Sequence, residues 1–177
     1  MFFRARQPET SIWRRFRTSV DGFSFAEEDG YHTAHVVANA ERTVDLFLAL
    51  AEHMPPAVDI AIDDARTGRR WHGEGLALPD VRDVLARVKP LLATFGGVEI
   101  SIFTREDQVT LNAVIELFIY ARTDRWLYIL QGKGLEERET LRAKSWKLKR
   151  HEFPSAPELV DAIAKVAETL RLTPAST

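Results

Sequence analysis

The chain of 177 residues contains no cysteine. This absence excludes disulfide bonds, zinc sites built on thiolates and a cysteine nucleophile. It is typical of a reducing compartment, so we expect a cytoplasmic protein. No apolar run approaches the roughly 18 residues of a membrane span, and the first six residues, MFFRAR, lack the apolar stretch of a signal peptide. We therefore expect no membrane partner.

The chain also lacks a strong excess of charge of either sign. Its 24 lysines and arginines face 26 aspartates and glutamates, for a formal net charge of −2. Domains dedicated to nucleic acids are usually basic, so any such binding must come from a local patch. Length and composition are those of one globular domain. We predict a single domain over residues 20–172, preceded by a basic, aromatic arm over 1–19 and followed by a frayed tail over 173–177.

Motifs of common catalytic and nucleotide-binding sites are missing as well. The two GxG pieces, residues 73–75 and 132–134, extend neither to a Rossmann fingerprint nor to a P-loop. No serine lies in a GxSxG elbow and no HExxH is present. We expect no metal and no cofactor, and a protein that is not an enzyme. A small enzyme with a site outside these motifs is kept as a third hypothesis.

The first half of the chain predicts two repeats of hairpin and helix. Asp29-Gly30 is a favoured tight-turn pair between strands, and Asn39 is a typical N-cap. Pro79 is tolerated in a first helical turn, and Gly96-Gly97 should end that helix. The expected elements are a hairpin over 23–37, a helix over 41–54, a hairpin over 58–76 that turns at 67–68, and a helix over 79–95 that Pro90 should kink.

The second half predicts a meander and a final helix. Strands are expected at 98–103, 108–122 and 125–131, with turns at 105–107 and 123–124. Residues 135–144 read as a short helix and 145–153 as an edge strand. Ser155 and Glu158 form the pattern of a capping box, which should open a helix that runs to about residue 171.

This order, ββα-ββα-βββ(β)α, predicts an α+β fold with a mostly antiparallel sheet and helices on one face. From about residue 41 onward the sequence of elements is helix, hairpin, helix, three-stranded meander and helix. Profilin-like and roadblock-like domains have the same element order. No motif accompanies the agreement, so we assign no family and transfer no residue role.

The strongest functional signal is aromatic. If the alternating apolar residues of 109–119 face the helices, the opposite sheet face carries large rings. Exposed patches of this kind mark partner surfaces. We predict a protein partner or a second copy of the chain, as a homodimer, on a face made of Phe103, Phe118, Tyr120, Trp126 and Tyr128. The arm, another part of the fold and a second chain are three alternative covers of this face.

Two charged features complete the candidates. Glu116 interrupts an otherwise apolar strand, so its carboxylate must be paired, face water or have a raised pKa. We expect it to pair with an arginine across the sheet rather than to act as a catalyst. The second feature is a basic patch around Trp146, typical of single-strand binding. It supports a second hypothesis, an anion- or nucleic-acid-binding domain, through Arg142, Lys144, Lys147, Lys149 and Arg150. A solvated edge strand guarded by lysines is the alternative explanation.

Overall fold

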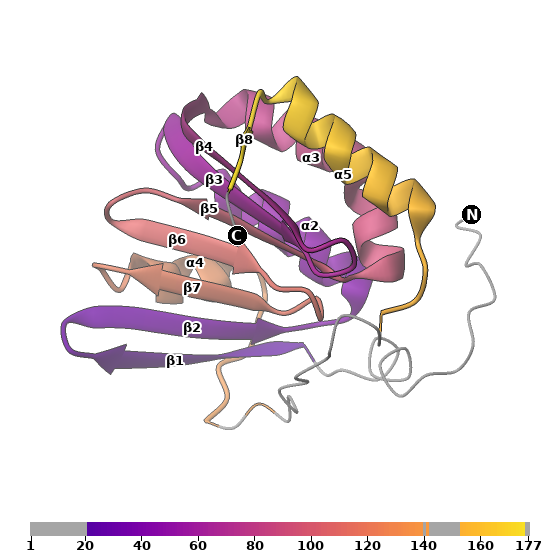
Figure 1. The fold of residues 1–177 in the computed structure, drawn as a ribbon. Coiled ribbons are helices and arrows are strands. Elements are labelled where there is room, and N and C mark those ends of the chain that lie inside the picture. Colours follow the sequence, from indigo (N-terminus) through magenta and orange to yellow (C-terminus); the bar gives the residue numbers. More distant parts are fainter. Residues whose placement is uncertain (1–20, 140, 142–152, 176–177) are drawn as a thin grey trace.

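The structure is a computed structural model, and it describes residues 21–139, 141 and 153–175. The described strands are β1 (Gly22–Glu28), β2 (Tyr31–Val37), β3 (Ala57–Asp64), β4 (Arg69–Ala77), β5 (Val98–Phe103), β6 (Asp107–Leu111), β7 (Leu117–Ala121) and β8 (Thr173–Pro174). The described helices are α2 (Ala40–Ala51), α3 (Leu78–Phe95), α4 (Arg125–Gly132) and α5 (Pro157–Thr169) (Figure 1).

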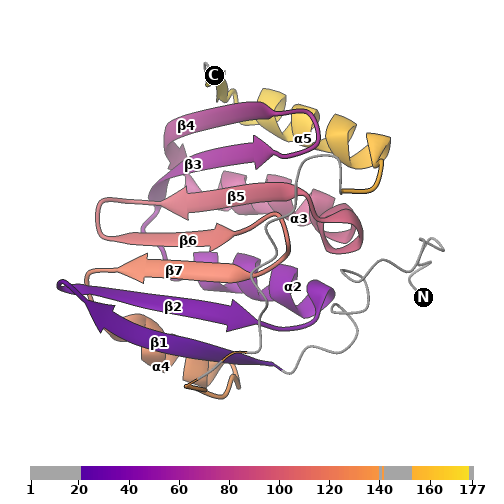
Figure 2. The same ribbon diagram turned by 60° about the horizontal axis from the view of Figure 1, so that its bottom comes forward.

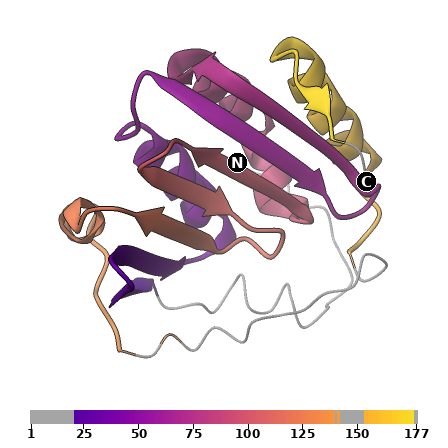
Figure 3. The same cartoon turned by 60° about the vertical axis from the view of Figure 1, so that its left-hand side comes forward.

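All described strands belong to one antiparallel sheet of eight, in the order β1-β2-β7-β6-β5-β3-β4-β8. The four described helices lie on the same side of this sheet, behind the strands in Figure 2. In Figure 3 the strands of residues 57–77 run in front of α3 and α5. The α+β fold with helices on one face is therefore confirmed.

Local signals account for most of the first half. Asp29 and Gly30 both have positive φ, 51° and 77°, as a type I′ hairpin turn requires. The Asn39 side chain accepts a hydrogen bond from the Arg42 N–H at 3.0 Å and caps α2. Helix α3 has a proline in its first turn, runs through Pro90 and ends at Gly96, whose φ is 54°. The predicted turn, the Asn39 cap, the proline in the first turn of α3 and its glycine end are confirmed.

The single strand predicted over 108–122 is wrong. A turn over 112–116 divides it into the hairpin of β6 and β7. The Asn112 side chain accepts hydrogen bonds from the N–H groups of Val114 and Glu116, which stabilises the turn. The alternation of apolar residues hid the turn, since Val109 and Ile119 pair across the hairpin and both are buried toward the helices.

The strand predicted over 125–131 is also wrong, because these residues form α4. Trp126 and Leu130, one helical turn apart, are its buried residues. The Trp126 Nε1–H donates to Asp107 Oδ1 at 2.8 Å, and Arg125 pairs with the other oxygen of Asp107 at 2.5 Å. Both bonds tie α4 to the start of β6. The described residues 135–139 and 141 contain no helix, and Glu137 instead forms a bridge with Phe23.

The C-terminal region departs from prediction in two places. Helix α5 begins at Pro157 with Ala156 as its N-cap, and no side chain caps it, so the predicted Ser155–Glu158 capping box is wrong. Thr173 and Pro174 pair with His72 and Trp71, so the chain is not frayed at that point and adds β8 to the sheet. The arm over 1–19 and residues 145–152 of the predicted edge strand lie outside the described residues. The sequence did not predict that β8 would join the sheet.

The core lies between the sheet and the helices. Helices α2 and α3 supply the fully buried Leu50 and Leu85. Alternate positions of β3, β5, β6 and β7 supply Ile60, Ile62, Ile100, Ile102, Leu111, Leu117 and Ile119. Arg66 donates to the carbonyl oxygens of Phe95 and Gly96 at the end of α3 and of Pro154 before α5, which holds the two helices together. Within the described residues, no helix is long and apolar enough to span a membrane.

Candidate functional site

One face of the sheet is covered by helices, and no helix or strand of the described residues covers the other, which we call the open face (Figure 2). The register places its side chains in rows that cross the strands. One row runs through Ser24, His35, Phe118, Thr110 and Ser101. The next row runs through Thr33, Tyr120, Gln108, Phe103 and Asp59.

A carboxylate and an imidazole meet on the open face where β7 begins. His35 Nε2 lies 2.9 Å from Glu116 Oε2. The His35 ring stacks on Phe118, with centroids 4.5 Å apart and planes 4° from parallel. The Glu116 side chain is only 2% exposed and that of His35 is 24% exposed. The pair therefore joins a buried acid to a partly accessible base, and the base is stacked on an aromatic ring.

The turn between β6 and β7 fixes the position of Glu116. The Asn112 N–H donates to the Glu116 carbonyl at 2.9 Å, and the Gly97 N–H donates to the Ala113 carbonyl at 2.7 Å. Ile115 has a φ of 59°, which a β-branched residue rarely adopts, so the turn stores backbone strain. A side chain at Gly96 would meet Ala113 O at 2.9 Å. The turn thus packs closely on the end of α3.

Hydroxyl and amide groups beside Phe118 satisfy one another. Ser101 and Thr110 are buried and their hydroxyl oxygens lie 2.9 Å apart. The Gln108 Nε2 donates to Thr110 Oγ1 at 2.9 Å. Because buried polar groups must be hydrogen-bonded, this network explains how polar residues are tolerated in the middle of the sheet.

Glu116 was expected to pair with an arginine, which stays a prediction, and His35 is a partner that the structure places against it. His32 and His35 lie on opposite faces, as their odd spacing in a strand predicts, and the sequence offered no sign that His35 would meet Glu116. A hydrolytic triad also needs a nucleophile bonded to the imidazole. Ser24 lies opposite His35 on β1, and among the described residues no hydroxyl is hydrogen-bonded to this histidine.

A metal centre finds no support in the part of the chain that the structure describes. There, no group of three or more histidine, aspartate or glutamate side chains lies close enough to hold an ion.

The open face carries three of the five predicted aromatic residues. Phe103, Phe118 and Tyr120 lie on it, and Tyr120 is 46% exposed. Trp126 and Tyr128 do not, because they belong to α4 rather than to a strand. Trp126 is fully buried against Asp107, and Tyr128 is 63% exposed on the helix. The predicted placement of these two residues is wrong.

Carboxylates accompany the aromatic rings on the open face. Asp63 lies directly opposite Glu99 in the pairing of β3 with β5, and Arg70 Nε contacts Asp63 at 2.7 Å. Desolvation on the sheet surface and, next, the Asp63 carboxylate raise the pKa of Glu99 above its ordinary value, against an opposing effect of Arg70. Asp59 adds a further acidic side chain beside Phe103. This half of the open face therefore has excess negative charge.

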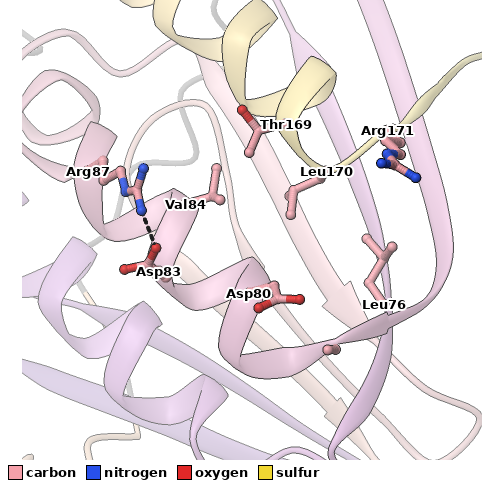
Figure 4. Close-up of a pocket in the computed structure, with 9 residues that line it drawn as sticks. Leu76, Asp80, Asp83, Val84, Arg87, Thr169, Leu170 and Arg171 are labelled. Atoms are coloured by element: carbon pink, nitrogen blue, oxygen red, sulfur yellow. Dashed lines mark hydrogen bonds and ion pairs between the residues drawn. The ribbon is translucent and has the colours of Figure 1, made fainter.

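A separate groove of about 310 Å³ lies between the start of α3 and the end of α5, away from the open face (Figure 4). Its walls carry mixed charges, with Asp83 paired to Arg87 at 2.5 Å and with Asp80 and Arg171 at the rim. The His35–Glu116 pair is not part of it.

The predicted basic patch, from Arg142 to Arg150, lies outside the described residues. Comparison with protein-family models, curated proteins and solved structures finds no match for this chain. The class is therefore defined by the structure alone: an α+β domain with an eight-stranded antiparallel sheet and, among the described residues, four helices on one of its faces.

Proposed function

We propose that this chain is a non-catalytic protein-interaction domain and that its open face is the contact surface. The observation that carries the proposal is the row in which Tyr120 and Phe103 flank Gln108 on the face that no described helix covers. One-sided antiparallel sheets normally turn polar residues toward water. An aromatic row in that position is typical of a surface that another polypeptide contacts.

The chemistry of the open face favours a basic partner. Asp59 supplies negative charge beside the ring of Phe103, and Glu99 and Asp63 supply more at the other end of β5 and β3. Guanidinium and ammonium groups bind to aromatic faces through cation–π attraction and to carboxylates through ion pairs. The proposed occupant is accordingly an extended protein segment that carries arginine or lysine together with aromatic residues. A second copy of the chain, as a homodimer, is the alternative occupant.

Nucleic acid is a weaker candidate on this face, because carboxylates repel phosphates. The anion-binding hypothesis rests on the patch of residues 142–150 and stays a prediction. Weak binding of a single-stranded oligonucleotide at about 50 mM salt, without a steep loss as salt rises, would contradict it. An enzymatic role would use the His35–Glu116 pair, and it stays the third hypothesis.

As for family, the element order from α2 onward agrees with that of profilin-like and roadblock-like domains, apart from α4 between β7 and α5. Agreement in element order supports a globular domain that presents a sheet face. It supports no particular activity or partner.

A peptide titration tests the proposal. The probe is a synthetic peptide of three Arg-Phe-Arg-Gly repeats, and its control has glutamate in place of each arginine. We expect the basic peptide to bind the full chain and the acidic peptide not to bind. Tyr120→Ala should weaken binding about fivefold, the loss expected for one aromatic contact to a cation.

Tyr128→Ala is the matched control, because it removes an exposed tyrosine from α4 and leaves the open face intact. Equal binding by the two tyrosine variants, or no binding of the basic peptide, would contradict the proposal. Light scattering is measured in parallel, and a dimer that Tyr120→Ala dissociates would make a second copy the occupant instead.

A further inference from the structure

The ligand proposed for the open face is cationic and aromatic, and the chain itself contains a segment of that composition. Residues 1–20 lie outside the described residues, so their chemistry is taken from the sequence. Within residues 1–19 there is one acidic residue, Glu9, and the basic and aromatic residues are Phe2, Phe3, Arg4, Arg6, Trp13, Arg14, Arg15, Phe16 and Arg17. Its charge is opposite to that of Asp59 beside Phe103 and to that of Glu99 and Asp63 at the other end of β5 and β3.

The first described residues place the end of this segment at the β1 edge of the sheet. Asp21 is paired with Arg42 at 2.5 Å, immediately before β1. From β1 the register leads through His35 of β2 to Phe118 of β7, two strand spacings or about 10 Å away. Nineteen residues span up to about 60 Å when extended. The segment is long enough to cross the whole open face.

We infer that residues 1–19 bind the open face of their own chain and compete there with a basic segment of a partner. This inference rests on the proposed function, since it names a regulator of the same surface. A tethered ligand of this length has an effective concentration in the millimolar range. If the tethered segment itself has a dissociation constant of about 0.1 mM for the face, a partner segment would then bind about tenfold more weakly than to an unoccupied face.

Disulfide trapping in the full chain tests the placement, because the natural chain has no cysteine. The test variant is Thr10→Cys with Gln108→Cys, which puts one thiol in the segment and the other between Phe103 and Tyr120 on the open face. The control variant is Thr10→Cys with Asp45→Cys. Asp45 is exposed on α2, one turn from the Arg42 that holds Asp21, so it lies close to the start of the segment.

If the segment binds the open face, the Gln108→Cys variant should form its intramolecular disulfide at least about tenfold faster than the Asp45→Cys variant. Adding Arg14→Glu, Arg15→Glu and Arg17→Glu should make the two rates equal. Equal rates in the original pair would overturn the inference. Disulfides formed only between chains would overturn it too, and would make the open face a surface for a second copy.

The repeat peptide used above separates this inference from the proposed function. With the three arginines replaced by glutamate, the full chain should bind that peptide about tenfold more tightly than the natural chain. If the peptide binds through Tyr120 but the trapping rates are equal, the inference fails and the proposed function stands. If the peptide binds neither chain, both fail.

Discussion

The two faces of the sheet are made from the same strands and differ in almost every physical respect. Toward the helices, Ile60, Ile102 and Ile119 pack in a layer whose largest buried side chains are hydrocarbon except for Trp126, whose indole N–H is bonded to Asp107. On the open face, the same strands present Asp59, Phe103 and Tyr120. The first face is a hydrophobic core. The second combines rings, hydroxyl groups and carboxylates that need specific partners.

The residues that stabilise the fold lie mainly on the helix-covered face, and the residues available for function lie on the open face. Burial of apolar side chains contributes about 1.5–3 kcal/mol for each large residue, and the helix-covered face contains most of them. The open face must satisfy polar groups within the sheet, as His35 with Glu116 and Ser101 with Thr110 do. Substitutions on the two faces should therefore change the free energy of unfolding by different amounts.

The largest difference is expected between two neighbouring residues of β7. Ile119 is 1% exposed toward the helices and Tyr120 is 46% exposed on the open face. Ile119→Ala should lower the free energy of unfolding by about 3 kcal/mol, because it removes buried methyl groups and leaves a cavity. Tyr120→Ala should lower it by less than about 1 kcal/mol. Urea unfolding of both variants measures the difference.

Comparable losses for the two variants would mean that the ring of Tyr120 is part of the core. In that case the peptide experiment with Tyr120→Ala would report on folding rather than on contact. The linear dependence on urea concentration should keep the same slope in both variants, since neither changes the surface that unfolding exposes.

A smaller effect is expected from two histidines of the open face. His35 pairs with the buried Glu116, whereas His72 lies exposed on β4 in the same row of the sheet. His35→Ala should cost about 1–2 kcal/mol, because it removes a hydrogen bond from a buried carboxylate and a stacked ring from Phe118. His72→Ala should change stability by less than about 0.5 kcal/mol. Equal effects would show that the pair does not stabilise the sheet.

Sequence patterns predicted the helix-covered face well because its signals are local. Alternation over β3 and β5, the cap at Asn39 and the Asp29-Gly30 turn each depend on a few consecutive residues. The same alternation failed at 112–116, where it continued across a turn that Asn112 could have indicated. At 125–131 the apolar residues fit a strand and a helix equally, and the spacing of Trp126 and Leu130 was the overlooked helical signal.

The site could not be predicted because its contacts are distant in the chain. His35 and Glu116 are 81 positions apart, and they meet only because β2 pairs with β7. No periodicity within either strand indicates that pairing. What could be predicted was the identity of the residues on the open face of β5 and β7, namely Phe103, Phe118 and Tyr120. The residues that surround them on the sheet could be identified only from the register of the strands.

The smallest effect concerns charge on the open face. The raised pKa of Glu99 means that the folded chain favours the protonated side chain. This contribution to stability is fully present below the pKa of the unfolded chain, about 4.3, and is lost as pH rises through the raised value. At neutral pH the ionised Glu99 faces Asp63, so it destabilises the fold.

Glu99→Gln should therefore stabilise the chain at pH 7 by about 0.2–0.5 kcal/mol, a modest gain because the side chain is exposed. The gain should shrink as the pH falls, because the natural residue then takes up its proton. Glu106→Gln, in the exposed turn between β5 and β6, is the control for removing a carboxylate outside the β3–β5 pairing. A stability gain for Glu99→Gln that does not shrink as the pH falls would mean that side-chain shape, and not charge on the open face, causes it. If the gain does follow pH, the excess carboxylate is retained at a cost to stability, as expected of a surface that binds a basic segment.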